Sequence, residues 1–283
     1  MPSIDRDRIT EAVIRSFDKS DDPRLKQVVE RLVTHLHAFA REVDLTPEEW
    51  RRAIDFLHRA AAISSDARSE FVLTSDVLGL SSLVDLLRDR SGATERSVLG
   101  PFHAEGAPLL PVDGDLIRDN AGAPLLVRGH VYDGAGKPLA DAEIDFWQAA
   151  DNGKYWPQDA AQAKFNLYCR MQTGADGRYA FTTVKPAPYT VPYDGPVGDL
   201  LRAGGRHAWR PAHFHFKVAV PGHQTLVTEL FFAGDPYLDA DAVFGVRAKL
   251  VLEPQPGEAA DAARYRLHKP HERVEFDFRL PAL

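Results

Sequence analysis

The residues most able to carry chemistry are two histidines, His213 and His215, separated by one residue. Side chains alternate between the two faces of a β-strand, so a strand over residues 213–220 would present both imidazoles on one face. The neighbouring Phe214 and Phe216 would then pack into the core behind them. Two adjacent imidazoles form half of a metal site. The pair alone is a weak indication, because buried histidines are also satisfied by ordinary hydrogen bonds.

The chain offers oxygen rather than sulfur as the other half of such a site. Its one cysteine, Cys169, excludes a site built from several thiolates, and no glutamate follows within a few residues of His215. Tyrosines do occur between the predicted strands, at Tyr155 and Tyr189. A phenolate is a hard anionic ligand, so two histidines with two tyrosines favour ferric iron over zinc. Any single tyrosine is more often a packing residue, and only the combination supports a metal site.

The β-rich part of the chain that would hold these residues begins at Leu125. Short alternating segments separated by turn residues predict an antiparallel β-sandwich. The predicted strands cover residues 126–132, 142–147, 178–184, 213–220, 224–232, 248–252 and 274–280.

The first third of the chain is predicted to be helical. Apolar residues recur at steps of three and four over residues 25–39 and again over 73–87. The segment 46–49, Thr-Pro-Glu-Glu, is a strong helix start, with Thr46 as the cap and Glu49 closing a capping box. Core packing is the ordinary explanation for the apolar stripes, and a dimer surface is a compatible alternative.

Between these parts, residues 98–124 are rich in glycine and proline, which predicts a linker. The apolar start of this segment predicts that it packs on the domain that follows. We therefore expect an α+β protein with three parts. These are an N-terminal helical dimerisation domain (1–97), the linker (98–124) and a β-sandwich catalytic domain (125–283) that holds the iron site.

Composition and charge disfavour several other classes of protein. The formal net charge of -7 argues against a nucleic-acid-binding protein, which is usually basic. The N-terminus is charged and lacks the apolar core of a signal peptide, and no apolar run approaches the roughly 18 residues of a membrane span. With one cysteine, these features predict a soluble cytoplasmic protein. The chain also lacks the Gly-x-Gly-x-x-Gly fingerprint of nicotinamide and flavin enzymes.

Several longer segments resemble the intradiol ring-cleavage dioxygenases, the non-haem ferric family of catechol and hydroxyquinol 1,2-dioxygenases. The most specific match is Arg-Pro-Ala-His-Phe-His at residues 210–215. The other matches follow in order along nearly the whole chain, at residues 74–79, 98–102, 129–133, 142–148, 189–201, 205–215 and 234–237. Segments 188–198 and 241–246 resemble the hydroxyquinol branch more than the catechol branch.

The resemblance implies roles for individual residues. It implies Fe(III) as the cofactor, with the ligands Tyr155, Tyr189, His213 and His215, and with Tyr168 and Tyr193 as rivals for the tyrosine positions. Tyr189 would leave the metal and accept a substrate proton, and Arg210 would stabilise negative charge. Glu229 stands where catechol relatives have glutamine, and it would pair with Arg210 or accept a proton from an extra substrate hydroxyl. The positions that shape the substrate pocket correspond to Leu73, Asp76, Leu99, Gly100, Pro101, Phe102, Val191, Pro192 and Arg210.

The implied activity is cleavage of hydroxyquinol (benzene-1,2,4-triol) by O2 between its vicinal hydroxyls, giving 3-hydroxy-cis,cis-muconate or maleylacetate. Catechol or a substituted catechol, cleaved to a cis,cis-muconate, is the alternative substrate. A remote alternative is a non-catalytic, transthyretin-like binding module, which residues 127–139 alone would fit. The resemblance also implies a homodimer formed through the N-terminal helices, and it leaves open whether a lipid lies between them.

Overall fold

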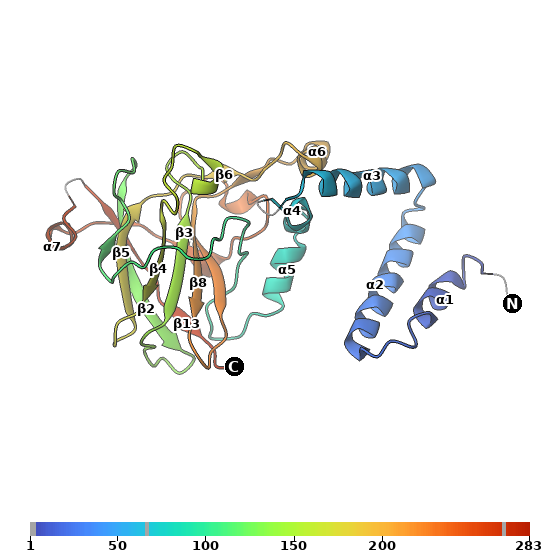
Figure 1. Cartoon of the computed structure of the whole chain (residues 1–283), viewed down its shortest axis with the longest axis horizontal. Helices are drawn as coiled ribbons and strands as arrows, with labels where there is room; N and C mark the ends of the chain where they lie inside the picture. The colour runs from blue at the N-terminus through green and yellow to red at the C-terminus, as the bar shows by residue number, and fades with distance from the viewer. Residues whose placement is uncertain (1–3, 66–67, 268–269) are drawn as a thin grey trace. The chain divides into compact units, whose positions relative to one another are not determined.

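The computed structural model describes residues 4–65, 68–267 and 270–283 of the chain. The chain forms two compact units, Met1–Arg59 and Ala60–Leu283. The fold is α+β as predicted, because an N-terminal helical region precedes a region built from β-sheets (Figure 1). Among the helices of the described residues, none is both long and apolar enough to cross a membrane.

The N-terminal unit contains α1 (Ile9–Arg15), α2 (Pro23–Glu42) and most of α3 (Pro47–Ile63). α1 packs on α2, where Thr10 Oγ1 lies 3.0 Å from His37 Nδ1. The predicted capping box of α3 is confirmed, since Glu49 N donates to Thr46 Oγ1 over 3.2 Å and Thr46 N donates to Glu49 Oε2 over 2.9 Å. The sequence does not predict α1, because two turns without a side-chain cap leave little pattern to detect.

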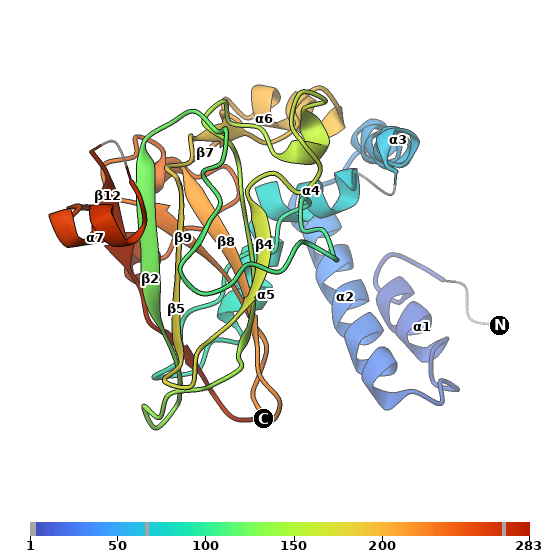
Figure 2. The same cartoon turned by 60° about the vertical axis from the view of Figure 1, so that its left-hand side comes forward.

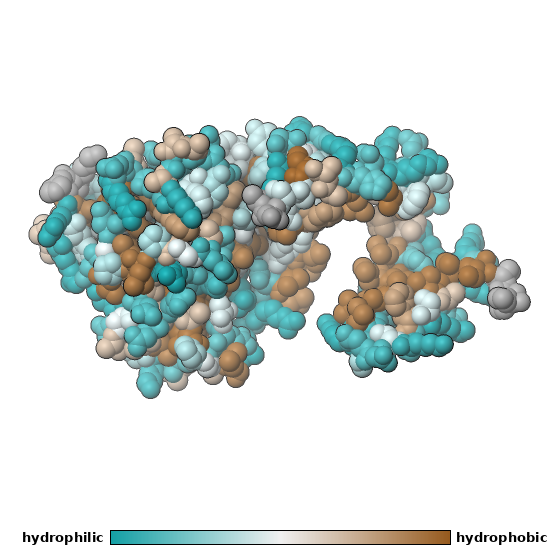
Figure 3. All heavy atoms as spheres, viewed as in Figure 1, coloured by the Kyte–Doolittle hydropathy of each residue, from teal (hydrophilic) through white to brown (hydrophobic). Residues whose placement is uncertain are grey.

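The apolar stripe predicted over residues 25–39 lies on α2, but its side chains are not enclosed within the N-terminal unit. Leu32 is 55% exposed and Phe39 is 53% exposed. Brown, hydrophobic side chains are visible on the surface of these helices in the space-filling view (Figure 3). Core packing within this unit therefore does not account for the stripe.

Two further helices, α4 (Glu70–Val77) and α5 (Leu80–Leu86), occupy the periodic segment over residues 73–87. Gly79 separates them with a φ of +74°, a left-handed conformation that glycine adopts without strain. The stretch predicted as one apolar segment is therefore two short helices.

The helices α4 and α5 belong to the second unit rather than to the first. Ser82 Oγ of α5 donates to Phe244 O over 2.7 Å, and Val197 N donates to Glu70 Oε1 of α4 over 3.0 Å. Contacts of this kind place the unit boundary after Arg59, whereas the sequence grouped residues 1–97 together.

Two mixed sheets form the body of the second unit. Their strands are β1 (Gly114–Asp115), β2 (Pro124–Asp133), β3 (Glu143–Gln148), β4 (Tyr168–Gln172), β5 (Arg178–Val184), β8 (His213–Ala219), β9 (Leu226–Phe232), β10 (Val251–Leu252), β11 (Gln255–Pro256), β12 (Glu272–Glu275) and β13 (Phe278–Leu280). One sheet has the order β1-β5-β2-β12-β11, with β13 also paired to β2, and the other has the order β10-β9-β8-β3-β4 (Figures 1 and 2). A separate pair, β6 (Tyr189–Thr190) and β7 (Trp209–Arg210), completes the β-structure.

The pairs β2–β5, β3–β4, β3–β8 and β8–β9 are antiparallel, in agreement with the antiparallel sandwich that the sequence predicts. Parallel pairing involves the short strands β1, β10, β12 and β13, together with an isolated bridge between Leu109 and Arg170. These strands reach the sheets after long connections, which parallel pairing requires. The sequence does not predict β4.

The hydrophobic core lies between the two sheets. The ring of Phe146 on β3 has its centroid 4.6 Å from that of Phe181 on β5 and 5.2 Å from that of Phe216 on β8. All three side chains are fully buried. The connections carry α6 (Pro196–Ala203), α7 (Ala259–Arg264), η1 (Trp156–Gln158), η2 (Leu238–Ala240) and η3 (Ala248–Leu250), of which the η elements are short 3-10 helices.

Candidate metal centre

Strand β8 presents two imidazoles side by side. His213 Nε2 and His215 Nε2 lie 3.1 Å apart, and both side chains are buried. Phe214 and Phe216, at the alternating positions, belong to the core between the sheets. β3 and β9 pair with the two edges of β8, so its backbone and the direction of its side chains are fixed.

The phenol of Tyr155 reaches the same point from the connection between β3 and β4. Its Oη lies 3.0 Å from His215 Nε2 and 3.4 Å from His213 Nε2. The ring of Tyr155 stacks on Phe102 with centroids 4.5 Å apart, and Tyr155 N donates to Gln158 Oε1 over 3.0 Å. These contacts hold a fully buried side chain in one orientation.

Tyr189 comes to the centre from β6. It stands directly opposite Arg210 in the antiparallel pair β6–β7, so the two side chains lie on the same face. The ring centroid of Tyr189 is 5.4 Å from that of His213 and 5.4 Å from that of Tyr155. The pairing of two residues on each strand is therefore enough to bring Tyr189 and Arg210 together beside the histidines.

The two imidazoles are neutral. Burial and the neighbouring Arg210 lower the pKa of His213 to about 4, and burial lowers the pKa of His215 well below its ordinary value. His213 Nδ1 lies 2.7 Å from Pro211 O, and we assign the ring proton to Nδ1 from this contact. The Nε2 lone pair of His213 is then directed at the centre.

The donor atoms fit a metal ion. The Nε2 and Oη atoms of His213, His215 and Tyr155 are 3.0–3.4 Å apart, about the separation of neighbouring ligands with bonds of roughly 2.1 Å. Burial raises the pKa of Tyr155 and of Tyr189, and a bound cation would act in the opposite sense and favour the phenolates. Two neutral imidazoles with two phenol oxygens suit a hard cation better than zinc.

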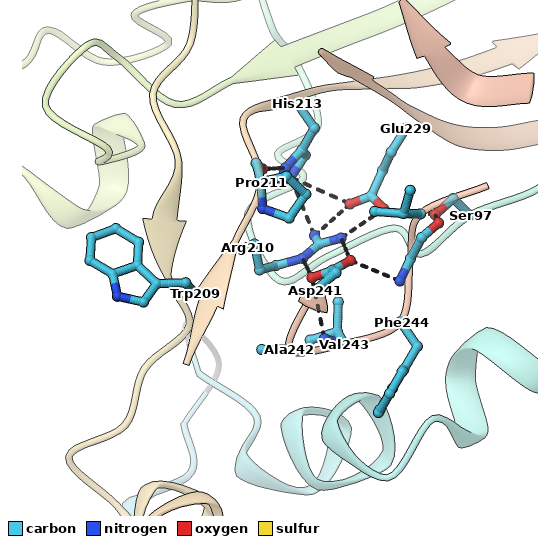
Figure 4. Close-up of polar contacts among 12 residues, drawn as sticks. Ser97, Trp209, Arg210, Pro211, His213, Glu229, Asp241, Ala242, Val243 and Phe244 are labelled. Carbon is cyan, nitrogen blue, oxygen red and sulfur yellow. Dashed lines mark hydrogen bonds and ion pairs between the residues drawn. The ribbon is translucent and has the colours of Figure 1, made fainter. Parts of the chain in front are cut away.

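Glu229 of β9 lies within reach of both histidines, but its carboxylate is already engaged (Figure 4). Its Oε1 accepts from Arg210 Nη1 over 2.6 Å, and its Oε2 accepts from Arg210 Nη2 over 2.9 Å and from Ser97 Oγ over 2.7 Å. Oε1 is also 3.4 Å from His213 Nε2 and 3.5 Å from His215 Nδ1, but a neutral imidazole forms no ion pair. These contacts favour Glu229 as the ion-pair partner of Arg210 over Glu229 as a metal ligand.

Arg210 is buried between two carboxylates, those of Glu229 and Asp241. Asp241 accepts from Arg210 Nε over 3.0 Å and from Nη2 over 3.1 Å. Burial would lower the pKa of Arg210, but the two carboxylates raise it well above its ordinary value. Burial would likewise raise the pKa of Glu229, but Arg210 lowers it to about 2. The guanidinium of Arg210 and the carboxylate of Glu229 are therefore charged.

Comparison with known proteins identifies the family. Residues 100–282 match the family described as dioxygenase, and residues 22–96 match the catechol dioxygenase N terminus. The chain is 45% identical over 276 residues to hydroxyquinol 1,2-dioxygenase of Nocardioides simplex, which covers 95% of this chain and 93% of the relative. This chain belongs to the intradiol ring-cleavage dioxygenases.

Solved structures of intradiol dioxygenases have the same fold. Hydroxyquinol 1,2-dioxygenase from Pseudomonas putida DLL-E4 is 42% identical with a TM-score of 0.90, covering 98% of this chain and 99% of that one. Catechol 1,2-dioxygenase from Pseudomonas arvilla C-1 is 33% identical with a TM-score of 0.83, covering 99% and 93%. The family uses non-haem iron, with which the donor set described above is compatible.

A cavity of about 180 Å³ adjoins the centre of this intradiol dioxygenase. The wall of the cavity includes Phe102, and the ring of Phe102 stacks on Tyr155. Of the residues predicted to shape the substrate pocket, five line this cavity: Leu73, Asp76, Pro101, Phe102 and Pro192. Leu99 and Gly100 line a neighbouring groove of about 590 Å³. Val191 is buried, and like Arg210 it lines neither space. The sequence missed Arg68, Ser69, Val72 and Gln158, which complete the cavity wall.

Gly100 shows how closely the linker approaches the metal centre of the dioxygenase. It has a φ of +70°, and a Cβ built on it would lie 3.0 Å from His215 Cε1. A side chain at this position would therefore be strained and would press on the imidazole.

The four side chains predicted as ligands are brought together, while the two rival tyrosines are placed otherwise. Tyr168 Oη donates to Phe102 O over 2.8 Å, and Tyr193 is 50% exposed. Sequence reasoning missed Asp241 and Ser97 as members of the site. For Asp241 the available signal was the resemblance of the segment 241–246 to the hydroxyquinol branch, which indicates a subfamily but no role for individual residues.

Proposed function

We propose that this protein is an Fe(III)-dependent dioxygenase that cleaves hydroxyquinol with O2 between its vicinal hydroxyls, giving 3-hydroxy-cis,cis-muconate or maleylacetate. The observation that carries the proposal is the meeting of four donor side chains beside the cavity, those of Tyr155, Tyr189, His213 and His215. The relatives named as hydroxyquinol 1,2-dioxygenases, similar over nearly the whole chain, support this substrate. Ferric iron, when bound, would act as a Lewis acid that holds the deprotonated diol and withdraws electron density from the ring.

Tyr189 is the side chain that would accept a substrate proton, at its Oη. Tyr155 is held by its stacking on Phe102, whereas Tyr189 sits on a strand of two residues at the edge of the centre. Arg210 lies opposite Tyr189, so a guanidinium N–H is available beside the oxygens whose charge changes. A donor placed in this way stabilises negative charge that develops on the substrate.

Asp76 supports a triol as the substrate. It is 7% exposed on α4 and lines the cavity together with the apolar Leu73, Phe102 and Pro192. Burial raises the pKa of Asp76 above its ordinary value. A third ring hydroxyl could donate to this carboxylate, whereas a catechol would leave a buried acid without a new partner. Selectivity for hydroxyquinol over catechol would follow from this difference.

The test is turnover by iron-loaded protein under air, with hydroxyquinol and catechol compared side by side. We expect uptake of one O2 for each ring cleaved, a higher kcat/KM for hydroxyquinol, and a visible tyrosinate-to-iron charge-transfer band. A colourless protein that is replete with iron would overturn the ligand set. The absence of ring cleavage with both substrates would overturn the function, and a preference for catechol would establish the alternative substrate.

We also propose that the helical part of the chain (residues 1–97) forms a homodimer, and that residues 98–124 serve as the linker that packs on the catalytic domain (125–283). The exposed apolar stripe on α2 supports the dimer, since such a surface is usually covered. Light scattering should give twice the mass of the chain, and Leu32→Glu should shift the protein toward a monomer. Mass spectrometry of the native protein would show whether a lipid accompanies the dimer, and a wild-type monomer would contradict the proposal.

A further inference from the structure

The guanidinium of Arg210 has almost no free hydrogen-bonding capacity. Arginine carries five N–H donors. Nε and one N–H of Nη2 donate to Asp241, and the other N–H of Nη2 and one N–H of Nη1 donate to Glu229, at 2.6–3.1 Å. The last N–H of Nη1 is on the side of His213 Nε2, 3.3 Å away. One donor therefore remains, and it faces the metal centre.

The charges of this cluster show that direction, rather than net positive charge, is what Arg210 supplies. Arg210, Glu229 and Asp241 are 2%, 0% and 6% exposed. Two carboxylates surround one guanidinium, so the cluster as a whole carries a negative charge. A lone cation would attract a substrate anion from any direction. A guanidinium whose positive charge is balanced by two carboxylates acts instead through the one N–H that it aims.

Asp241 also binds the backbone of its own loop (Figure 4). Its Oδ1 accepts from Val243 N over 3.3 Å, and its Oδ2 accepts from Gly245 N over 2.8 Å. The carboxylate is therefore held on both sides, by the loop and by Arg210. Because a short carboxylate held in this way has little freedom to rotate, it fixes the plane of the guanidinium.

Gly245 and Ser97 complete the cluster. A Cβ built on Gly245 would lie 2.6 Å from Arg210 Nη2 and 2.7 Å from Glu229 Oε2, so only glycine leaves room for these atoms. Ser97 Oγ, with one proton to donate, lies 2.7 Å from Glu229 Oε2 and 2.9 Å from Gly245 O. The contacts thus form a closed circuit from Ser97 through Glu229, Arg210, Asp241 and Gly245 back to Ser97.

We propose that Asp241 is a positioning residue for the dioxygenase reaction, which acts through Arg210 and, with Glu229 and Ser97, aims its one remaining N–H at the oxygens of the bound substrate. The proposal rests on the function proposed above. It adds that the arginine works as an oriented donor and that its orientation depends on residues that touch neither metal nor substrate.

The main test is the variant Asp241→Asn, which keeps the shape of the side chain and removes its charge. We expect kcat for hydroxyquinol to fall by about 10- to 100-fold while KM changes by less than about threefold, because the aimed donor matters most for charge that develops in the transition state. The iron content and the charge-transfer band of the resting protein should match those of the wild type. The spectrum of the anaerobic complex with 4-nitrocatechol, a coloured vicinal diol, should shift.

Two comparisons separate positioning from a merely structural role. In an Arg210→Ala background, Asp241→Asn should change kcat by less than about twofold, because residues that act through one another are not additive. Asp261→Asn is the matched control, since Asp261 is also buried and lies 3.3 Å from an arginine, Arg128, but belongs to α7. This control should leave kcat unchanged.

The outcomes decide the proposal in either direction. A wild-type kcat in Asp241→Asn, a loss matched by an equal loss of iron, or an undiminished loss in the Arg210→Ala background would each overturn it. If Asp241→Asn does not fold, Ser97→Ala decides, with an expected fall in kcat of about 3- to 10-fold at unchanged iron content. Failure of the proposed function would be seen in the wild type itself, as no iron or no ring cleavage.

Discussion

Two clusters of arginine and aspartate in the second unit use the same chemistry in different surroundings. Around Arg210, the partners Glu229 and Asp241 have fully buried side chains and stand beside the metal centre. Around Asp113, the partners Arg178 and Arg264 have side chains that are 26% and 57% exposed. Both clusters join distant parts of the chain, but only the first excludes water from its charges.

The difference in burial decides what each cluster can do. A buried charge that loses its partner cannot be solvated, so the Arg210 cluster must remain complete and its geometry is fixed. A half-exposed ion pair is screened by water and contributes little to stability. We therefore expect the buried cluster to control activity and folding together, and the exposed cluster to make a small contribution to stability alone.

Removal of Arg210 should have the largest effect. In Arg210→Ala two buried carboxylates face each other without a cation, which should cost about 3–5 kcal/mol in the free energy of unfolding. The same change removes the donor at the metal centre and should lower kcat by about 10²–10³-fold. Urea unfolding and steady-state rates measure the two effects. Arg178→Ala is the control from the exposed cluster, expected to lose about 1 kcal/mol with kcat unchanged; equal losses in both variants would contradict the comparison.

Glu229→Gln should have a moderate effect that does not depend on the substrate. Both oxygens of the carboxylate already accept hydrogen bonds, from Arg210 and Ser97, so we expect its role to be to hold Arg210 rather than to bind an additional substrate hydroxyl. Loss of its charge should loosen Arg210 and lower kcat by about 10-fold, equally for hydroxyquinol and catechol. Steady-state rates on both substrates measure this. A selective loss with hydroxyquinol would mean that Glu229 contacts the third hydroxyl after all.

Asp76→Asn should change the choice of substrate rather than the overall rate. The amide is a weaker acceptor for a phenol hydroxyl than the carboxylate, which should lower kcat/KM for hydroxyquinol by about 10-fold and leave catechol within about twofold. The ratio of kcat/KM for the two substrates is the measurement. An unchanged ratio would remove Asp76 from recognition of the third hydroxyl.

The parts of the molecule that could be predicted from the sequence depend on local pattern. The alternation around His213 and His215 places both imidazoles on one face of β8, and the segment 46–49 specifies the start of α3. In both cases the decisive contacts connect residues within a few positions of one another. The strands β2, β3, β5, β8 and β9 are predicted for the same reason, since each has its own local pattern.

The parts that could not be predicted arise from contacts between distant residues. Ser97 meets Glu229 from 132 positions away, and Asp241 meets Arg210 from 31 positions away, only after the sheet and the loops have formed. No spacing in the sequence marks such a pair. The sequence does not predict β1, and it predicts strands over residues 248–252 and 274–280 without the parallel pairing of β10, β12 and β13. Strands of two to four residues do not indicate which sheet edge they join.

The exposed cluster should show the smallest effect, and its pH dependence gives a separate signature. Burial would raise the pKa of Asp113, but hydrogen bonds from Arg178, Arg264 and Tyr265 lower it from 3.8 to about 2. A carboxyl whose pKa is lower in the folded state stabilises the fold above the unfolded pKa, and this contribution is lost as the pH falls from about 4 through about 2. Because water screens the cluster, Asp113→Asn should lose only about 1 kcal/mol at neutral pH. Urea unfolding at pH 7 and at decreasing pH should show the free energies of unfolding of the wild type and the variant converging below pH 4. A constant difference across this range would show that the stabilisation does not come from the charge of Asp113.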